Sequence, residues 1–418
     1  MRNRHRHHTI SRLAMVAGVA VLAAAPAVPQ QQVLPPIARY TIDAGTVSGM
    51  GAMGSGGGLG AALNMMRGGN QVAHEMTLRL GSTRASTGAP KADHFLPDPM
   101  RMGKSVPLIT PVAGTPGREV PGGVPEGRMP RGRLLLFWGC GEHAPKGQPV
   151  VIDFSKLAQG QLPPGLYAKP LNLPDDWSVL TSNSTTYGDW PNARDTKTVP
   201  ANASLLGAHR VASTYAPEIS FTLQNDFMEA LRPTTSAMPS NAVGLNWNAV
   251  PSATGYYAWA MGAKMDGSSA NGQPTDMVWW TSSATQQFGG QLADWIAPST
   301  VARLITAKTV MPPSQTSCTI PAEVKAAGGE MLMTTLYAYG PQADFAYPPR
   351  PANPKVAWKP EWIARVRFRA HAMVMAGMPG MGSTADDTTQ GQAQPQSTLP
   401  KCKGGLGGIA ARAAGLCK

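Results

Sequence analysis

Glycine and proline recur along the whole chain and limit the secondary structure that it can form. The 418 residues include 46 glycines and 39 prolines, whereas charged residues make up only 14%. In a helix interior, glycine costs about 1 kcal/mol and proline about 3 kcal/mol relative to alanine. Long, salt-bridged helices are therefore disfavoured, and the composition predicts an all-β protein with short strands and many turns.

The first 27 residues have the three zones of a secretory signal peptide. Arginines between Arg2 and Arg12 precede an apolar run over residues 13–25, and the small-x-small triplet Ala25-Pro26-Ala27 closes it. The run is shorter than the roughly 20 apolar residues of a membrane-spanning helix. We therefore expect a signal peptide at residues 1–27, cleavage after Ala27, and a periplasmic or secreted mature protein. No cysteine lies at the cleavage site, so no lipid anchor is expected.

The net charge bears on the partners of the protein. The chain carries a formal charge of +12 at pH 7, part of which belongs to the signal arginines. A positive protein attracts acidic partners such as envelope phospholipid or polysaccharide. The basic residues are spread along the chain and form no basic helix or stripe, so nucleic acid is not an expected partner. The charge fits an envelope protein or polysaccharide as partner, but the simpler interpretation, a soluble basic protein, is favoured.

Four cysteines enter an oxidising compartment, and they allow three pairings. Cys402 and Cys417 flank a short Gly-rich segment, which favours a local disulfide there, with Cys140–Cys318 as the second bridge. The alternative for Cys140 is a nucleophile with His143 as its base. Cys140 follows a strand-like run in a Gly-rich turn, which favours a structural cysteine.

Residues 28–73 are predicted to be an extended, Gly- and Met-rich segment. Within them, residues 44–66 carry no charge. Two interpretations remain for this stretch. It is a flexible spacer, because glycine loses most entropy on ordering, or its small residues at four-residue spacing let helices pack closely in a membrane or oligomer. The spacer is favoured over membrane association.

The first domain is expected at residues 74–235 as an irregular β domain. Its predicted strands are short, are bounded by Gly, Pro or Asn turns, and carry apolar residues at alternate positions or in compact runs. They lie at residues 75–80, 133–138, 149–154 and 218–223.

Residues 236–349 contain the one recognisable pattern. Leu245 and Trp247 lie in a strand-like run that Tyr256-Tyr257-Ala258-Trp259 follows, with further runs at residues 316–321 and 331–340. These four segments resemble strands B, C, E and F of a fibronectin type III module, and the resemblance implies a β-sandwich. One inserted helix is predicted at residues 298–305. The whole chain also resembles a group of exported bacterial proteins without an assigned activity, and neither resemblance supplies a catalytic residue.

The fibronectin-like register places strands C and F side by side, so their outward side chains form one aromatic and Met patch. Its members are Tyr257, Trp259, Met261, Met333, Tyr337 and Tyr339. A patch of this size is rarely bare on a monomer. Either the first domain or the final strand covers it, which is favoured, or it is a platform for a protein strand or a sugar ring.

The C-terminal part divides into a final strand with a Met-rich segment at residues 350–382 and a disordered linker with a Cys-flanked basic tail at residues 383–418. In the predicted strand, at residues 362–375, arginines alternate with apolar residues, but the face of the strand is not determined. The Met-rich run from His371 to Met381 offers thioethers, which favour Cu(I), but Met also fills irregular apolar gaps. Packing is favoured, so no metal site is assigned.

The remaining motifs do not predict catalysis. Histidines of the mature chain are far apart in sequence, and neither a His-Glu-x-x-His nor a Gly-x-Ser-x-Gly motif occurs. Gly49, Gly51 and Gly54 have the spacing of a dinucleotide-binding loop, but Glu75 precedes the next predicted strand instead of ending it, so no cofactor is expected. We expect an exported cell-envelope protein with a binding or structural role. The alternatives are a periplasmic Cu(I)-binding protein that uses the Met-rich segments and an unrecognised envelope hydrolase.

Overall fold

The computed structural model describes residues 31–54, 72–111, 132–158, 161, 171, 173, 177–265, 274–329 and 331–377. The predicted signal peptide, the Gly-rich residues 55–71, the Gln-rich linker and the Cys402–Cys417 pairing lie outside the described residues.

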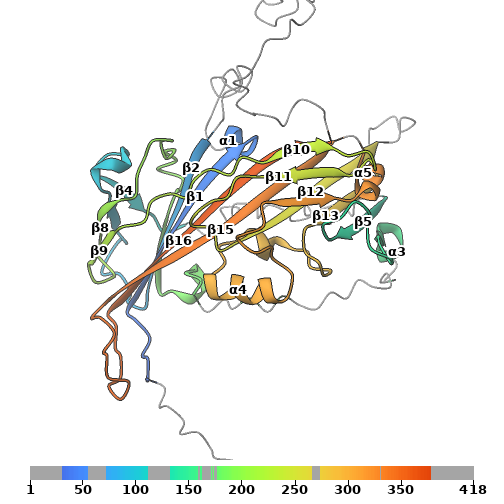
Figure 1. Cartoon of the computed structure of the whole chain (residues 1–418). Helices are drawn as coiled ribbons and strands as arrows, with labels where there is room; N and C mark the ends of the chain where they lie inside the picture. The colour runs from blue at the N-terminus through green and yellow to red at the C-terminus, as the bar shows by residue number, and fades with distance from the viewer. Residues whose placement is uncertain are drawn as a thin grey trace, which may run out of the picture.

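A nine-stranded sheet runs through the molecule, in the order β6-β5-β13-β12-β15-β16-β1-β2-β7 (Figure 1). Neighbouring strands are antiparallel except for β1 with β16 and β5 with β13, which are parallel. The strands are β1 (Ala38–Gly49), β2 (Val72–Ser82), β5 (Arg133–Trp138), β6 (Val150–Asp153), β7 (Thr186–Trp190), β12 (Gly255–Met265), β13 (Pro274–Thr281), β15 (Leu332–Tyr347) and β16 (Trp362–Ala376). The expected all-β class is confirmed.

Two smaller sheets pack against one face of the large sheet. One has the order β10-β11-β14 and the other β4-β3-β8-β9. Their strands are β10 (Thr234–Ala237), β11 (Val243–Asn246), β14 (Ser317–Ile320), β3 (Ala92–Phe95), β4 (Ser105–Leu108), β8 (Gly207–Ser213) and β9 (Ile219–Leu223). One continuous cluster of buried apolar side chains joins the three sheets.

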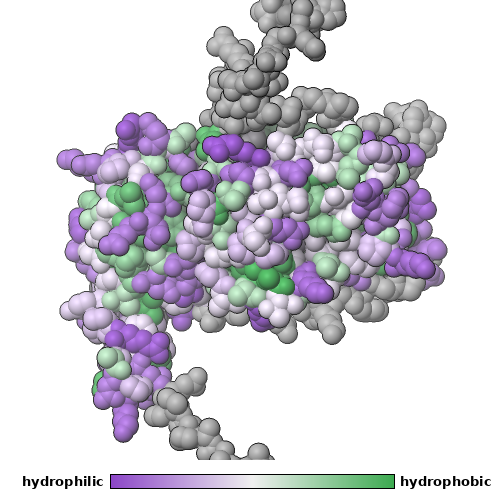
Figure 2. Space-filling view, viewed as in Figure 1, coloured by the Kyte–Doolittle hydropathy of each residue, from purple (hydrophilic) through white to green (hydrophobic). Residues whose placement is uncertain are grey.

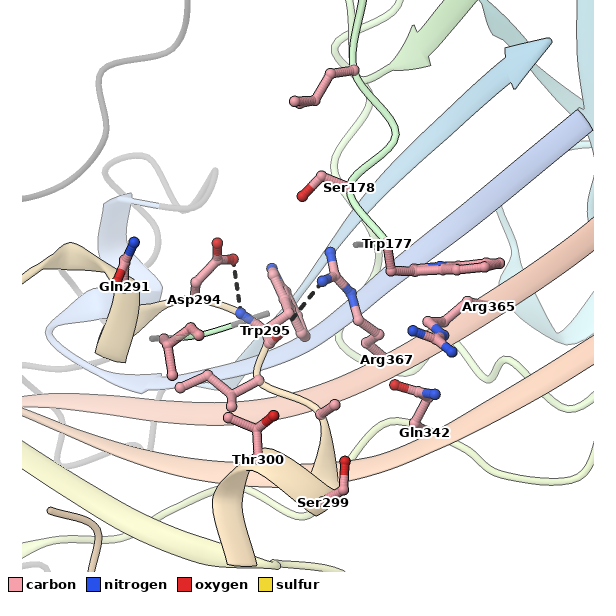
Figure 3. A pocket seen from close by; sticks show the side chains of 14 residues that line it. Trp177, Ser178, Gln291, Asp294, Trp295, Ser299, Thr300, Gln342, Arg365 and Arg367 are labelled. Atoms are coloured by element: carbon pink, nitrogen blue, oxygen red, sulfur yellow. Dashed lines mark hydrogen bonds between the residues drawn. The ribbon is translucent and has the colours of Figure 1, made fainter. Parts of the chain in front are cut away.

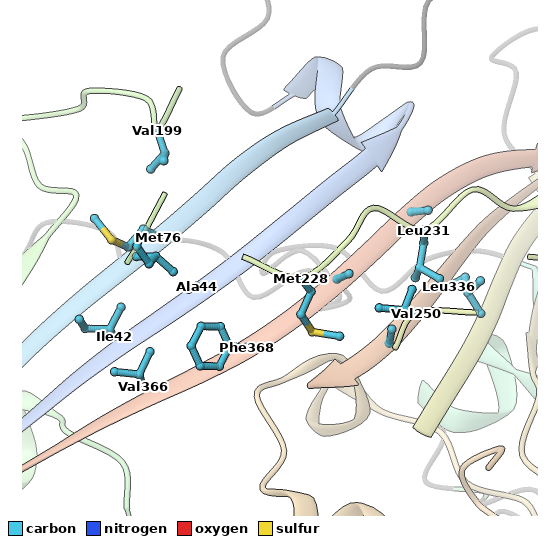
Figure 4. Close-up of a cluster of buried hydrophobic side chains, with 14 of the residues drawn as sticks. Ile42, Ala44, Met76, Val199, Met228, Leu231, Val250, Leu336, Val366 and Phe368 are labelled. Atoms are coloured by element: carbon cyan, nitrogen blue, oxygen red, sulfur yellow. The ribbon is translucent and has the colours of Figure 1, made fainter. Parts of the chain in front are cut away.

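Strand alternation explains how the large sheet supplies this core. On β1, Ile42 and Ala44 point to the same face, beside Val366 and Phe368 of β16 (Figure 4). Met228, from the chain that follows β9, packs into the same cluster. The face opposite to this core carries charged side chains on β1, β2 and β16.

The helices in the described part of the chain are short. They are α1 (Gly51–Gly54), α3 (Phe154–Ala158), α4 (Pro298–Thr306) and α5 (Ala322–Gly328), with 3-10 turns η1 (Asp98–Met100), η2 (Thr181–Asn183) and η3 (Gly290–Ala293). Proline at the first helical position suits the start of α4, and Val301 and Leu304 form its buried face. The predicted helix at residues 298–305 is therefore confirmed. None of the helices in the described part of the chain has the length and hydrophobicity needed to cross a membrane.

The strands do not separate into two sheets at residue 235, where the boundary between two domains was expected. β5 and β6, from the predicted first domain, extend the large sheet beside β13, which belongs to the predicted second one. On the other side, β16 of the predicted C-terminal segment pairs with β1. The predicted strands themselves are present, because residues 75–80, 133–138, 149–154 and 218–223 lie in or overlap β2, β5, β6 and β9.

The expected spacer needs correction in its first part. Residues 38–49 form β1, a central strand whose residues 40–48 are all buried. A β-carbon on Gly45 would lie 2.5 Å from Cγ of Glu75, so glycine here leaves room for the Glu75 side chain of the paired strand to lie across β1. Residues 44–54 therefore belong to the folded sheet and α1, instead of to a flexible or membrane-associating segment.

A disulfide joins Cys140, in the turn after β5, to Cys318 on β14. This confirms the second predicted bridge and removes the alternative of a thiol nucleophile at Cys140. His143 instead lies 3.1 Å from a carboxylate oxygen of Glu323, at the start of α5.

Candidate functional site

The predicted aromatic and Met patch lies on one face of the large sheet. β12 and β15 are paired, with Tyr257 opposite Tyr337 and Met261 opposite Met333. Residues two apart on a strand share a face, so all six predicted residues point away from the small sheets. Tyr257, Tyr337 and Tyr339 are nevertheless buried, so this part of the patch is covered, as the favoured interpretation requires, and is not a bare platform.

A segment inserted between β13 and β14 covers these tyrosines. Leu292, Val301, Leu304 and Val310 form a second buried cluster with them. The Tyr339 hydroxyl donates a hydrogen bond to the carbonyl of Leu292, and burial raises the pKa of Tyr339 well above its usual value. The first domain or the final strand was expected to cover the patch. The cover instead consists of η3 and α4.

Charged residues occupy the neighbouring half of the same face. Arg367 of β16 donates two hydrogen bonds, of 2.6 and 2.8 Å, to the Asp43 carboxylate on β1. Arg79 of β2 donates to the same carboxylate at 2.5 Å. The Asp43 side chain is completely buried, so its charge must be paired, and both arginines contact it.

The two other arginines of β16 are held in the same way. Arg365 donates to both carboxylate oxygens of Asp344 at 2.8 and 2.9 Å. Arg369 donates to Glu75 at 2.9 Å and to the carbonyl of Ala293. Each guanidinium is therefore fixed by an acid on an adjacent element or strand, which orders this surface.

A pocket of about 470 Å³ opens above the charged strands (Figure 3). Residues 177–180 form one wall, and residues 291–300, from η3 to the start of α4, form the other. Arg367 lies between the rings of Trp177 and Trp295, with Arg365 and Gln342 below Trp177 (Figure 3). The guanidinium carbon of Arg365 lies 4.1 Å from the centre of the Trp177 ring, a cation–π contact.

Two polar atoms at this pocket have no hydrogen-bond partner among the described residues. They are Nε1 of Trp177 and Oε1 of Gln342, and both are buried. The amide nitrogen of Gln342 donates to Asp344 at 2.9 Å, which fixes the orientation of the side chain. Such unpaired buried atoms are costly, and both belong to residues that line the pocket.

The charges around the pocket are nearly compensated. The arginines at its base are paired with Asp43 and Asp344, and Asp294 adds a further carboxylate to the lining. Within the described lining, Asp294 is the one acid, so the paired carboxylates of a glycoside hydrolase are not assembled there. The arrangement is suited to holding a polar ligand by hydrogen bonds and ring contacts.

Histidines form a second polar cluster, in the core between the large sheet and the four-stranded sheet. Tyr40 is hydrogen-bonded to Nδ1 of His94, Nε2 of His94 to Nδ1 of His209 at 2.9 Å, and Nε2 of His209 to the Leu205 carbonyl at 2.7 Å. With both imidazoles neutral, every donor in this chain has an acceptor. Burial lowers the pKa of both histidines, so the cluster is structural at neutral pH.

Sequence reasoning missed the pocket. The alternating arginines of β16 were visible, but their face was not, and Trp177 and Trp295 lie in irregular segments without periodicity. The described residues contain no group of three or more His, Cys, Asp or Glu side chains placed to hold a metal ion. Comparisons of the chain with protein-family models, curated proteins and solved structures found no match.

Proposed function

We propose that this chain is an exported cell-envelope protein with a binding role, and that its pocket takes a sugar unit of an envelope polysaccharide. The pocket between Trp177 and Trp295 is the observation that carries the proposal. Its volume of about 470 Å³ is within the range of roughly 300–1,000 Å³ of small-ligand sites. Export rests on the signal-like residues 1–27.

The chemistry of the lining favours a neutral or weakly charged polar ligand. Sugars present hydroxyl groups that pair with guanidinium and amide groups, and apolar ring faces that contact aromatic side chains. Arg365, Arg367 and Gln342 supply the first kind of group, and the two tryptophans supply the second. Because the arginines already have carboxylate partners, a strongly anionic ligand gains less here than it would from free cations.

The same features favour binding over the hydrolase alternative. Hydrolysis needs an acid and a base or nucleophile on opposite sides of the scissile bond. The groups at the base of the pocket are arginines bound in ion pairs. They position a ligand but supply no proton at neutral pH.

We further propose that the C-terminal half is a fibronectin type III-like sandwich that extends to β16. In such sandwiches strand B pairs with E, and C with F. The corresponding strands here are β11 with β14 and β12 with β15. Leu245, Trp247 and Tyr256 lie in the buried cluster between the two sheets, as the resemblance implies. The surface visible in Figure 2 mixes hydrophilic and hydrophobic residues, with compact hydrophobic patches among the hydrophilic ones.

Binding is tested by titrating the mature protein with three soluble probes: peptidoglycan fragments, lipopolysaccharide core oligosaccharide and maltohexaose. Trp177→Ala is expected to weaken binding about tenfold or more, because tryptophans in binding pockets carry a large share of the affinity. Trp358→Ala is the matched control, since Trp358 is also stacked with an arginine but lies outside the pocket. Absence of binding by all three probes, or equal weakening by both variants, contradicts the proposal.

A further inference from the structure

Four methionines lie at neighbouring register positions on the face of the large sheet that also carries the covered tyrosines. Met261 of β12 lies opposite Met333 of β15, and Met333 lies opposite Met375 of β16. Met373 precedes Met375 by two residues and shares its face. These four residues, named here the methionine row, come from three adjacent strands.

The distances within a sheet allow their sulfur atoms to converge. Directly opposed residues in an antiparallel pair have β-carbons about 4.5–5.5 Å apart, and diagonal neighbours about 7–8 Å. Methionine has three rotatable side-chain bonds beyond its α-carbon, so a thioether can reach several ångströms from its strand. Met333 is flanked on both sides, and the thioethers of Met261 and Met375 can therefore reach a point above it.

Packing does not explain these methionines as it explains others in the chain. Met76, Met100, Met228 and Met311 are buried in the main apolar cluster and fill it. Met333 is 37% exposed, and the three other members of the methionine row are half-buried. A methionine that is partly open to solvent on a sheet face does not fill a gap in the core.

Aromatic rings border the row. Trp279 of β13 lies opposite Met261, and Trp259 precedes Met261 by two residues on the same face. Both indoles are half-buried. An aromatic face attracts a cation, and an indole beside thioethers limits access of water to it. Glu75, an acid on this face, is bound to Arg369 and lies 3.7 Å from Nδ1 of His371.

We propose that Met261, Met333, Met373 and Met375 form a binding site for one Cu(I) ion. Thioether sulfur is a soft ligand that selects Cu(I) over hard divalent ions such as Mg²⁺ or Ca²⁺. Because the four thioethers are neutral, they can bind a monovalent cation without placing negative charges close together, and no ligand has to lose a proton. The site is separate from the pocket between Trp177 and Trp295, and it does not depend on the function proposed for that pocket.

The site is tested with Ag(I), which has the same ligand preference and is not oxidised in air. The mature, disulfide-intact protein is labelled with ¹³C at the methionine methyl groups and titrated with Ag(I), and Cu(I) is then added under reducing, anaerobic conditions. We expect the methyl signals of the methionine row to shift together up to one equivalent, while those of Met76 and Met100 stay in place. Shifts confined to other methionines, such as Met65, Met66, Met378 or Met381, overturn the proposal.

Substitutions test whether Ag(I) binds at the methionine row or at methionines elsewhere in the chain. Met333→Leu combined with Met375→Leu is expected to weaken Ag(I) binding by more than roughly tenfold, since even outer-shell changes at metal sites cost 10–100-fold. Met238→Leu is the matched control, because Met238 is half-buried but follows β10 of the three-stranded sheet, on the other face of the large sheet. Methionine-to-leucine exchange conserves volume, so both proteins are expected to fold. Equal affinities in the two variants overturn the proposal.

A second readout uses oxidation. Met333 in the free protein is expected to react with dilute hydrogen peroxide faster than the buried Met100, and one equivalent of Ag(I) is expected to protect it. Peptide mass spectrometry follows both residues in one sample. If Met333 is oxidised at the same rate with and without Ag(I), its sulfur is not a ligand and the proposal fails.

Discussion

Arg367 and Asp43 are separated by 324 residues in the sequence and form a two-pronged ion pair across the parallel strands β16 and β1. The pair connects the last strand of the described chain to the first. It also fixes the base of the candidate pocket, because Arg367 lines that pocket and donates to the Trp295 carbonyl at 3.2 Å.

Replacing Asp43 by Ala is expected to destabilise the protein by about 3 kcal/mol, near the lower end of values for a broken buried ion pair, since the two arginines are partly exposed. Urea unfolding measures the change. The control is Glu218→Ala, which breaks the exposed pair with Arg210 and is expected to cost at most about 1 kcal/mol. Similar losses in both variants contradict the role given to Asp43.

Stability is expected to fall with acid because of the Tyr40–His94–His209 chain. Burial lowers the pKa of His94, which the neighbouring His209 lowers further, whereas the unfolded histidines titrate near 6.5. Below pH 6.5 the unfolded state therefore binds more protons than the folded state, and the free energy of unfolding decreases as the pH falls. Above that pH the contribution is complete and constant.

This dependence is measured as the free energy of unfolding between pH 8 and 5 for the wild type and for His94→Gln combined with His209→Gln. The slope between pH 6.5 and 5 is expected to be smaller in the double variant, since carboxylates titrate mostly at lower pH. A slope that is unchanged by the two substitutions would falsify the assignment.

Removing the Cys140–Cys318 disulfide by a double serine substitution is expected to destabilise the fold by about 4 kcal/mol. The bridge closes a loop with a sequence separation of 178 residues, and the chain-entropy model predicts a large effect for a loop of this size. Thermal unfolding of both proteins gives the difference. Cys402→Ser with Cys417→Ser removes the same number of thiols around a much shorter loop, and it is expected to have a smaller effect.

Gly45→Ala tests the close contact between β1 and β2. The new β-carbon would lie 2.5 Å from Cγ of Glu75, so the carboxylate must move away from Arg369. We expect a loss of about 1–3 kcal/mol, as for other overpacked sites. Gly141→Ala is the control, because its nearest neighbour outside the adjacent residues is 3.4 Å away. A neutral effect at Gly45 shows that Glu75 rearranges freely.

Local patterns predicted much of the secondary structure and some of the burial. Alternation in residues 243–247 placed Leu245 and Trp247 on one face, the fibronectin-like register placed Tyr256 inward, and these three residues are buried. The short apolar runs at β5 and β6 were found for the same reason. β1 was missed because its glycines and uncharged small residues look like a spacer until β2 and β16 lie beside it.

The candidate pocket depends on contacts that no local pattern contains. Trp177 becomes part of a site only because Arg365 of β16 lies under its ring, and the tyrosines of the predicted patch become core only because α4 lies over them.

From the order of its amino acids alone, this chain shows a strand-rich character, the side of several strands that faces the core, and one short helix, since all of these depend on neighbours a few residues apart. Which strands lie next to each other, which acid balances which arginine, and which aromatic groups remain in contact with water were decided by the folded sheet. The reason is that a buried charge such as Asp43 must be paired, and its partners can lie far away in the sequence. Here Arg79 and Arg367 contact it from the strands on opposite sides of β1.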